Sequence, residues 1–150
     1  MRFKTLAVAL LSVSLAACAS SFPNSANACE QYFVASDQVT AIVDATFDDL
    51  GGLTDEQRLQ LIGTYSGAVK NQADKALLLD LALTSDGLAS TSDGLASSSL
   101  GNEVDDLVAL LSEQVFMLDF GGSDVTSLLR IQRLESQVES ECKDIGANLP

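Results

Sequence analysis

The side chains that could do chemistry are three cysteines and a large set of carboxylates. The cysteines are Cys18, Cys29 and Cys142, and the 150 residues include 21 acidic residues, 8 basic residues and no histidine. Without histidine the chain has no Ser-His-Asp or Cys-His catalytic arrangement, no Glu-x-x-His di-iron motif and no ordinary zinc site. The sequence therefore predicts no catalytic residues, no metal site and no cofactor.

The carboxylates include two adjacent pairs, Asp48-Asp49 and Asp105-Asp106. Adjacent residues on a helix point about 100° apart, so neither pair has the facing geometry of an acid–base dyad. We interpret both pairs as solvated. The formal net charge of −13 repels nucleic acid, whose binding requires neutralisation of phosphates by lysine and arginine. Nucleic acid is therefore excluded as an expected partner.

The N-terminus has the order of features that is typical of an export signal. Arg2 and Lys4 precede a 12-residue apolar segment, residues 6–17. This segment is too short to span a bilayer, which needs about 20 residues. A short basic region followed by an apolar segment and small residues indicates a secretory signal peptide.

The end of this segment resembles the lipobox of bacterial lipoproteins, which is a leucine, two small residues and an essential cysteine. The matching residues are Leu15-Ala16-Ala17-Cys18. The resemblance implies that residues 1–17 are removed and that Cys18 carries the lipid, with palmitate-type acyl chains. Several acyl chains give a stable membrane anchor. Ala19, in place of aspartate, resembles lipoproteins that are sent to the outer membrane where the host has one.

An alternative cleavage site is the A-x-A pattern Ala26-Asn27-Ala28, which would make Cys29 the first residue of a periplasmic or secreted protein. Eleven residues separate this site from the apolar segment, so we favour the lipobox. Residues 18–28 are then small and polar, and we expect them to form a flexible tether.

The remainder, residues 29–150, is expected to form one all-α domain of four helices. Apolar residues recur at three- and four-residue steps over residues 29–50, 54–83, 103–118 and 123–145. Thr54 and Gln57 form a capping box, and Asn102 and Ser123 are the expected N-caps of the last two helices. Glycines at 51–52, 121–122 and 146 are the expected helix stops.

Residues 84–101 are rich in serine and glycine and contain an exact tandem repeat of TSDGLAS, residues 84–90 and 91–97. The composition predicts a loop. We interpret the repeat as a duplication that the loop tolerates. A cation-binding loop is the less favoured interpretation, because the dense aspartate spacing of a calcium loop is missing.

Short connections favour an up-down-up-down four-helix bundle. In that topology the first helix begins at the end where the fourth finishes, so Cys29 and Cys142 lie at the same end. Export provides an oxidising compartment, and with Cys18 lipidated two cysteines remain. We therefore predict a Cys29–Cys142 disulfide, with two unpaired buried thiols as the alternative.

The sequence favours a small acidic envelope lipoprotein without enzymatic activity. It would be exported and anchored to a bacterial membrane by its lipid, and would bind an envelope protein or a small ligand. The alternative is a periplasmic or secreted chaperone-like protein, because Cys29-Glu30 loosely resembles the start of the first helix in small helical acid-stress chaperones.

Overall fold

The computed structural model describes residues 23–47, 52–88, 99–122 and 125–150. It contains four α-helices, and no strand occurs in these ranges. The helices are α1 (Ser25–Phe47), α2 (Asp55–Ser85), α3 (Ser99–Asp119) and α4 (Val125–Asp144). The predicted all-α four-helix fold is confirmed.

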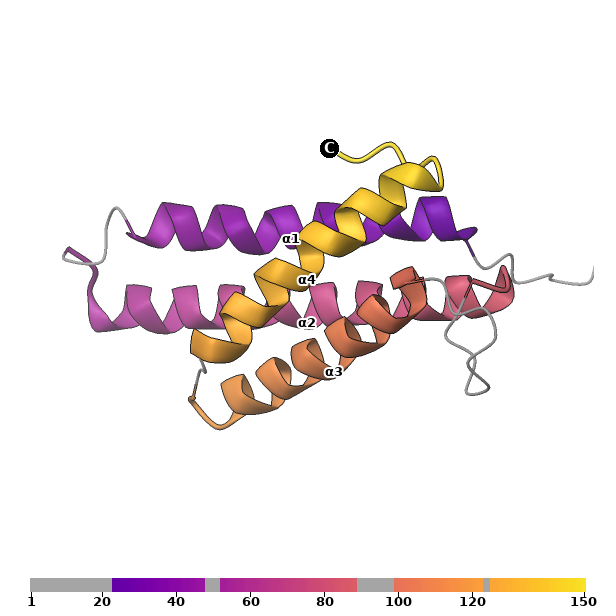
Figure 1. The fold of residues 1–150 in the computed structure, drawn as a ribbon. Helices are drawn as coiled ribbons and strands as arrows, with labels where there is room; N and C mark the ends of the chain where they lie inside the picture. The colour runs from indigo at the N-terminus through magenta and orange to yellow at the C-terminus, as the bar shows by residue number, and fades with distance from the viewer. Residues whose placement is uncertain (1–22, 48–51, 89–98, 123–124) are drawn as a thin grey trace, which may run out of the picture.

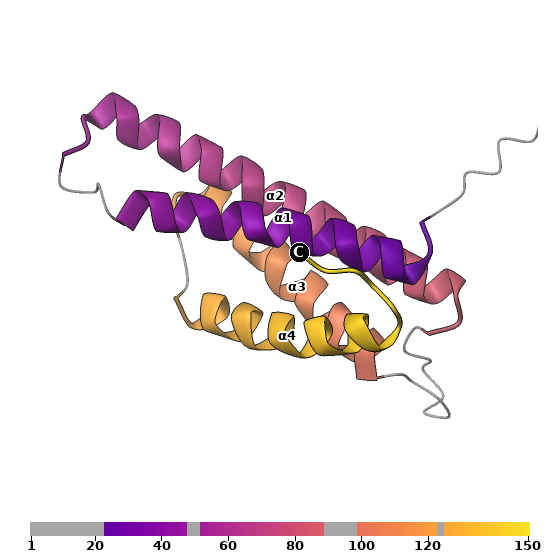
Figure 2. The same cartoon turned by 90° about the horizontal axis from the view of Figure 1, so that it is seen from above.

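The helices run alternately up and down, and each packs on its neighbours in the chain. α1 and α2 lie side by side as an antiparallel pair, and α4 crosses this pair obliquely (Figure 1). Seen from above, α4 is close to α1 near its own C-terminal end and diverges from it toward its N-terminal end (Figure 2). The bundle is therefore closed at one end and opens toward the other.

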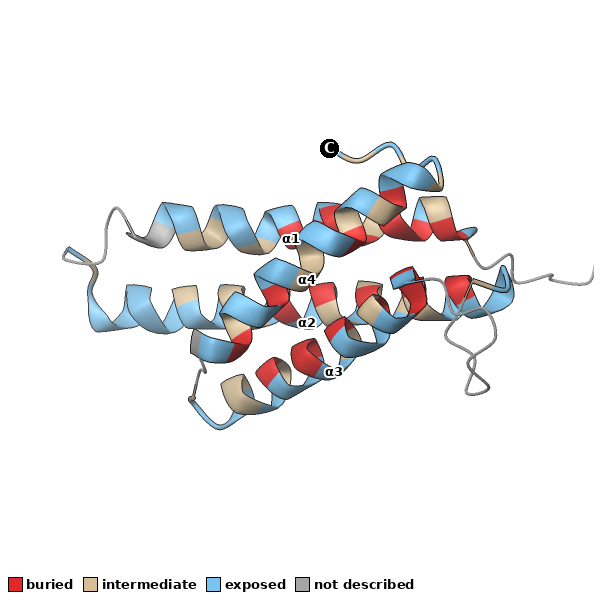
Figure 3. Ribbon diagram, viewed as in Figure 1, coloured by how far each residue is buried: buried red, intermediate tan, exposed pale blue. Residues whose placement is uncertain are grey.

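The hydrophobic core lies toward the closed end (Figure 3). Leucine is the commonest residue among its largest fully buried side chains, with Leu79, Leu83, Leu100, Leu107 and Leu111. They come from the C-terminal half of α2 and the N-terminal two thirds of α3, which face each other because the two helices are antiparallel. Burial of such side chains is the main source of stability in a bundle of this kind.

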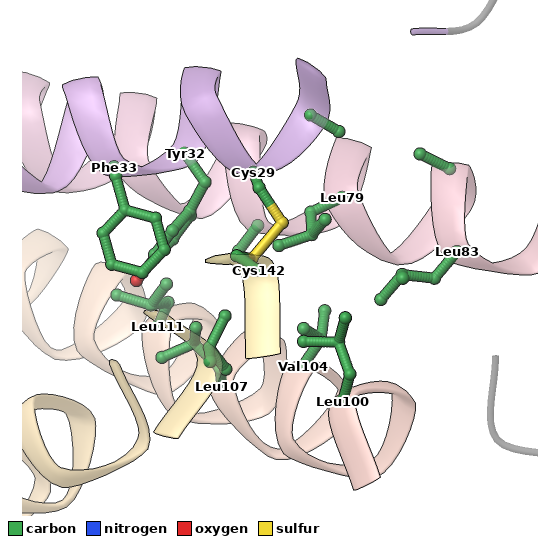
Figure 4. Close-up of a cluster of buried hydrophobic side chains, with 14 of the residues drawn as sticks. Cys29, Tyr32, Phe33, Leu79, Leu83, Leu100, Val104, Leu107, Leu111 and Cys142 are labelled. Carbon is green, nitrogen blue, oxygen red and sulfur yellow. A yellow bond between two sulfur atoms is a disulfide. The ribbon is translucent and has the colours of Figure 1, made fainter. Parts of the chain in front are cut away.

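A disulfide between Cys29 and Cys142 joins α1 to α4 inside this core, and both cysteines are fully buried (Figure 4). Their Cα atoms are 6.0 Å apart. The predicted disulfide is confirmed. We call the end of the bundle that contains it the clasped end, and the opposite end, where α3 ends and α4 begins, the open end.

The first helix begins earlier than the sequence suggested. α1 starts at Ser25, and Asn24 caps it by accepting a hydrogen bond from the backbone N–H of Asn27 at 2.9 Å. Ser25 and Ala28 are buried. The predicted tether over residues 18–28 is therefore wrong for residues 25–28, which belong to the domain; residues 18–22 lie outside the described ranges.

The second helix begins where its capping box predicted. The backbone N–H of Gln57 donates to the Thr54 hydroxyl at 3.3 Å, and that of Thr54 donates to the Gln57 side chain at 2.8 Å. The end of this helix and the start of the next differ from the prediction. Residues 84–85 continue α2 and residues 99–101 begin α3, so the loop is shorter than 84–101 at both ends.

Asn102 is consequently inside α3, and its prediction as an N-cap is wrong. The predicted cap Ser123, the predicted stop Gly51 and the second repeat copy lie outside the described residues. Gly121 and Gly146 have φ values of 74° and 89° just after α3 and α4, as expected for glycines that end helices.

Candidate functional site

A cavity of about 200 Å³ lies between the helices on the side of the core that faces the open end. Side chains from all four helices line it. Its apolar wall is formed by Val39, Val43, Val69, Leu111, Leu128 and Ile131. Cavities with apolar walls and a few convergent polar groups are the usual form of a small-ligand site.

Glu135, on α4, is the centre of the polar side of this cavity. Its Oε1 accepts hydrogen bonds from the Tyr32 hydroxyl at 2.7 Å, the Ser36 hydroxyl at 2.6 Å and Gln72 Nε2 at 2.7 Å. The three donors therefore converge on a single acceptor oxygen. The network connects α4 to α1 and α2 through buried polar groups.

Tyr32 lies behind this network rather than on the cavity wall. Burial, reinforced by the negative charge of Glu135, raises the pKa of the Tyr32 hydroxyl well above its ordinary value. The hydroxyl therefore stays protonated at neutral pH. It donates to Glu135 and accepts a bond from Gln72 Nε2 at 3.2 Å, so its position is fixed from both sides.

The charge of the lining is entirely negative. Among the described residues that line it, Asp44 and Glu135 carry charge, and none is a lysine or arginine. Ser36, Thr40, Tyr65, Gln72, Gln114 and Gln132 supply its neutral polar groups. A group that carries positive charge or N–H donors suits such a lining better than an anion does.

Large apolar side chains are exposed near the open end. Phe116 on α3 and Phe120, directly after the end of α3, are 61% and 75% exposed, and their ring centroids are 4.7 Å apart. Leu59 and Ile62 on α2 and Leu129 on α4 are also exposed. Grouped exposed apolar residues of this kind often mark an interaction surface.

Two carboxyl pairs face each other across helix interfaces. Asp80 on α2 faces Asp105 on α3, and burial together with the facing carboxyl raises the pKa of Asp80. Glu103 on α3 faces Glu141 on α4, and burial together with that charge raises the pKa of Glu103. Within the described chain, Glu103 Oε2 is shielded from solvent without a hydrogen-bond partner.

The sequence interpretation treated both adjacent acidic pairs as solvated, and Asp105 and Asp106 are both exposed. It missed that Asp105 also interacts with Asp80 on another helix. Asp48 and Asp49 lie outside the described residues. Spacing along one chain could not reveal a pair that forms between two helices.

The sequence interpretation also missed Glu135 and its partners. A usable signal was present: Ser36, Gln72 and Gln114 occupy positions that the helical spacing assigns to the buried faces, and all three are buried. A buried polar side chain requires a hydrogen-bond partner. Three such residues on three helices indicated a buried polar network, although not which residue would be its centre.

Cys18, the predicted lipid attachment site, lies outside the described residues. Over the ranges that the structure covers, no three of His, Cys, Asp and Glu gather into a set that could hold a metal ion. None of the described helices is long and apolar enough to cross a membrane.

Comparison of the sequence and the structure with known proteins does not assign the chain to a family. No family model matches the sequence, and no curated protein and no solved structure matches it significantly.

Proposed function

We propose that this protein is a non-enzymatic binding module, exported and anchored to a bacterial membrane by a lipid on Cys18. The basic residues, the short apolar segment and the sequence Leu15–Cys18 support the anchor. The start of α1 supports it further. Cleavage before Cys18 leaves the domain whole, whereas cleavage after Ala28 removes the first turn of α1, including the buried Ser25.

The binding site is the cavity that all four helices line. This is the single observation that carries the proposal, because the cavity lies beside the buried apolar core and side chains from all four helices line it. Its apolar wall and the polar network at Glu135 provide the two features that small-ligand sites combine, a desolvated surface and a few oriented polar groups.

In the anchored protein the cavity faces away from the membrane. The described chain begins at Pro23, at the clasped end, five positions after Cys18 in the sequence. α1 has 23 residues and is therefore about 35 Å long. The open end is thus displayed toward the compartment rather than toward the lipid head groups.

Labelling with a fatty acid analogue tests the anchor. We expect the label on the wild-type chain in the membrane fraction, and no label with release into the soluble fraction for Cys18→Ala. Ser20→Ala is the control, since it changes a nearby small residue without touching the lipobox. A mature chain whose N-terminal residue is Cys29 would contradict the proposal.

Titration of the isotope-labelled domain with hexanol, followed by NMR, tests the binding site. We expect shifts for the cavity-lining residues, and their loss in Val39→Phe, which fills the cavity from α1. Val34→Phe is the matched control, because Val34 is on the same helix, is half exposed and does not line the cavity. Equal binding by both variants would show that the ligand lies elsewhere.

A chaperone-like function is the second candidate, and the exposed Phe116–Phe120 pair favours it. Such a protein would suppress the aggregation of an unfolded client. Replacement of both phenylalanines by serine should then abolish the suppression, whereas the same change at Leu77 and Leu81, which are about half exposed on α2, should not. An unchanged effect in the phenylalanine variant would eliminate this candidate.

A further inference from the structure

We infer that the cavity is selective for a primary ammonium group on a short alkyl chain. This inference rests on the proposed function, since it names the ligand class of the same site. It depends on three observations, namely the volume of the cavity, the sign of the charges that line it, and the way in which Glu135 is already hydrogen-bonded.

The volume limits the ligand to a few atoms. The cavity measures about 200 Å³. An apolar cavity of about 150 Å³ accommodates benzene, so this one has room for about seven or eight non-hydrogen atoms. Drug-sized ligands need about 300 Å³ or more. An alkyl chain of four to six carbons with one polar head fits this limit.

The charges of the lining select the head group. Glu135 and Asp44 are its charged residues, and both are acidic. An anion entering this site would meet two carboxylates without a compensating cation, whereas an ammonium group would be attracted by both. The net charge of −13 acts in the same direction, because it raises the concentration of cations near the surface.

The hydrogen bonds of Glu135 determine where the head group would bind. The Tyr32, Ser36 and Gln72 donors all end on Oε1, which holds the carboxylate in one orientation. A carboxylate has two oxygens and about four acceptor sites, so Oε2 is the atom that accepts from the ligand. The network therefore preorganises the carboxylate, which reduces the entropic cost of binding.

Two sources could supply this chemistry, a free small amine or a lysine side chain of a protein. Both present a primary ammonium group at the end of an alkyl chain. NMR titration with hexylammonium and with Nα-acetyl-lysine methylamide distinguishes them. Tighter binding of hexylammonium indicates a free amine as the natural ligand, and tighter binding of the lysine derivative indicates a protein lysine.

A matched series of probes tests the selectivity. Hexylammonium, hexanol and hexanoate share the same alkyl chain and differ in the charge of the head group. We expect hexylammonium to bind the anchored or the soluble domain at least tenfold more tightly than hexanol, and hexanoate to bind less tightly than hexanol. Equal affinity for all three would overturn the inference while leaving the proposed function intact. Binding of none would overturn both.

Substitution of Glu135 tests the assigned residue. In Glu135→Gln, hexylammonium should lose its tenfold advantage while hexanol binds as before. Glu113→Gln is the control, because this substitution changes the net charge by the same amount at an exposed residue of α3 that does not line the cavity. A preference for hexylammonium that survives in Glu135→Gln would overturn the assignment.

A second variant covers the case in which Glu135→Gln does not fold. Asp44 is exposed where it lines the cavity, so Asp44→Asn should leave the fold intact. We expect a two- to threefold loss of hexylammonium affinity, with no change for hexanol. An unchanged hexylammonium affinity in a folded Asp44→Asn protein would contradict the electrostatic basis of the selectivity.

Discussion

Glu135 links the stability of this protein to its proposed binding site, because one of its oxygens holds donors from α1 and α2 together. No pattern in the sequence marks Glu135 as part of a buried network, because a glutamate on an amphipathic helix usually lies on the solvated face. Its role depends on Ser36 and Gln72, which lie 99 and 63 residues away along the chain. Local reasoning therefore could not identify it.

Replacement of Glu135 by leucine should destabilise the domain by about 2–4 kcal/mol, because the buried donors at Tyr32, Ser36 and Gln72 lose their acceptor. Urea denaturation followed by circular dichroism measures this change. Glu113→Leu serves as the control on an exposed site and should change the free energy of unfolding by less than about 0.5 kcal/mol. A loss of similar size in both variants would show that the network contributes nothing.

The carboxyl pairs predict that acidification stabilises the fold before it destabilises it. The pKa values of Asp80 and Glu103 are raised in the folded state, so the folded protein binds these protons more tightly than the unfolded chain does. Stability should rise as the pH falls from neutral through the raised pKa values of these two carboxyl groups. The pKa of Asp86 is instead lowered, chiefly by the hydrogen bonds from Ser25, so its contribution is lost at still lower pH.

Thermal unfolding measured between pH 7.5 and pH 3 should therefore give the highest melting temperature in mildly acidic buffer. In the variant with both Asp80→Asn and Glu103→Gln, the melting temperature at neutral pH should increase and the rise between pH 7.5 and pH 5 should flatten. A wild-type melting temperature that falls steadily from pH 7.5 would contradict the assignment of these pairs.

At the scale of the helices, apolar spacing and glycine positions predicted the number and order of the elements. The capping box at Thr54 also fixed the start of α2 correctly. The start of α1 was missed, because its cap is the unremarkable Asn24 and its first turn looks like a polar linker in the sequence. That turn is stabilised from a distance: Asp86 Oδ2 accepts bonds from the backbone N–H of Ser25 at 2.8 Å and from its hydroxyl at 2.6 Å.

Asn24→Ala should lower the free energy of unfolding by about 1 kcal/mol, which is the usual cost of losing an N-cap. Asn27→Ala is the matched control, because Asn27 is exposed within the same helix and does not cap it. Chemical denaturation of both variants checks the prediction. If the two variants are equally stable, the helix does not begin where the structure places it.

At the scale of the whole molecule, the sequence predicted the topology and the disulfide but not the divergence of α4 from α1. Ile62 and Leu129 are among the apolar residues that recur at helical spacing in residues 54–83 and 123–145, yet they are 58% and 62% exposed. The reason is geometric. α3 and α4 have 21 and 20 residues, whereas α2 has 31. Because α4 also crosses the α1–α2 pair obliquely, α3 and α4 do not cover the full length of α2.

The Cys29–Cys142 disulfide closes a loop with a sequence separation of 113 residues. Its replacement by two serines should therefore lower the free energy of unfolding by about 4–5 kcal/mol in the chain-entropy model. Both proteins should carry Cys18→Ala, so that only the disulfide differs between them. Denaturant titration measures the difference, and a loss below about 1 kcal/mol would show that packing alone holds the clasped end.

The clasped end also gives the molecule a mechanical property. α1 and α4 are joined covalently at Cys142, and α4 extends for about 26 Å from that junction to Val125. Over this length, a rotation of about 5° at the disulfide moves the far end of α4 by about 2 Å. A small rotation of α4 about the disulfide would therefore change the aperture of the cavity at the open end.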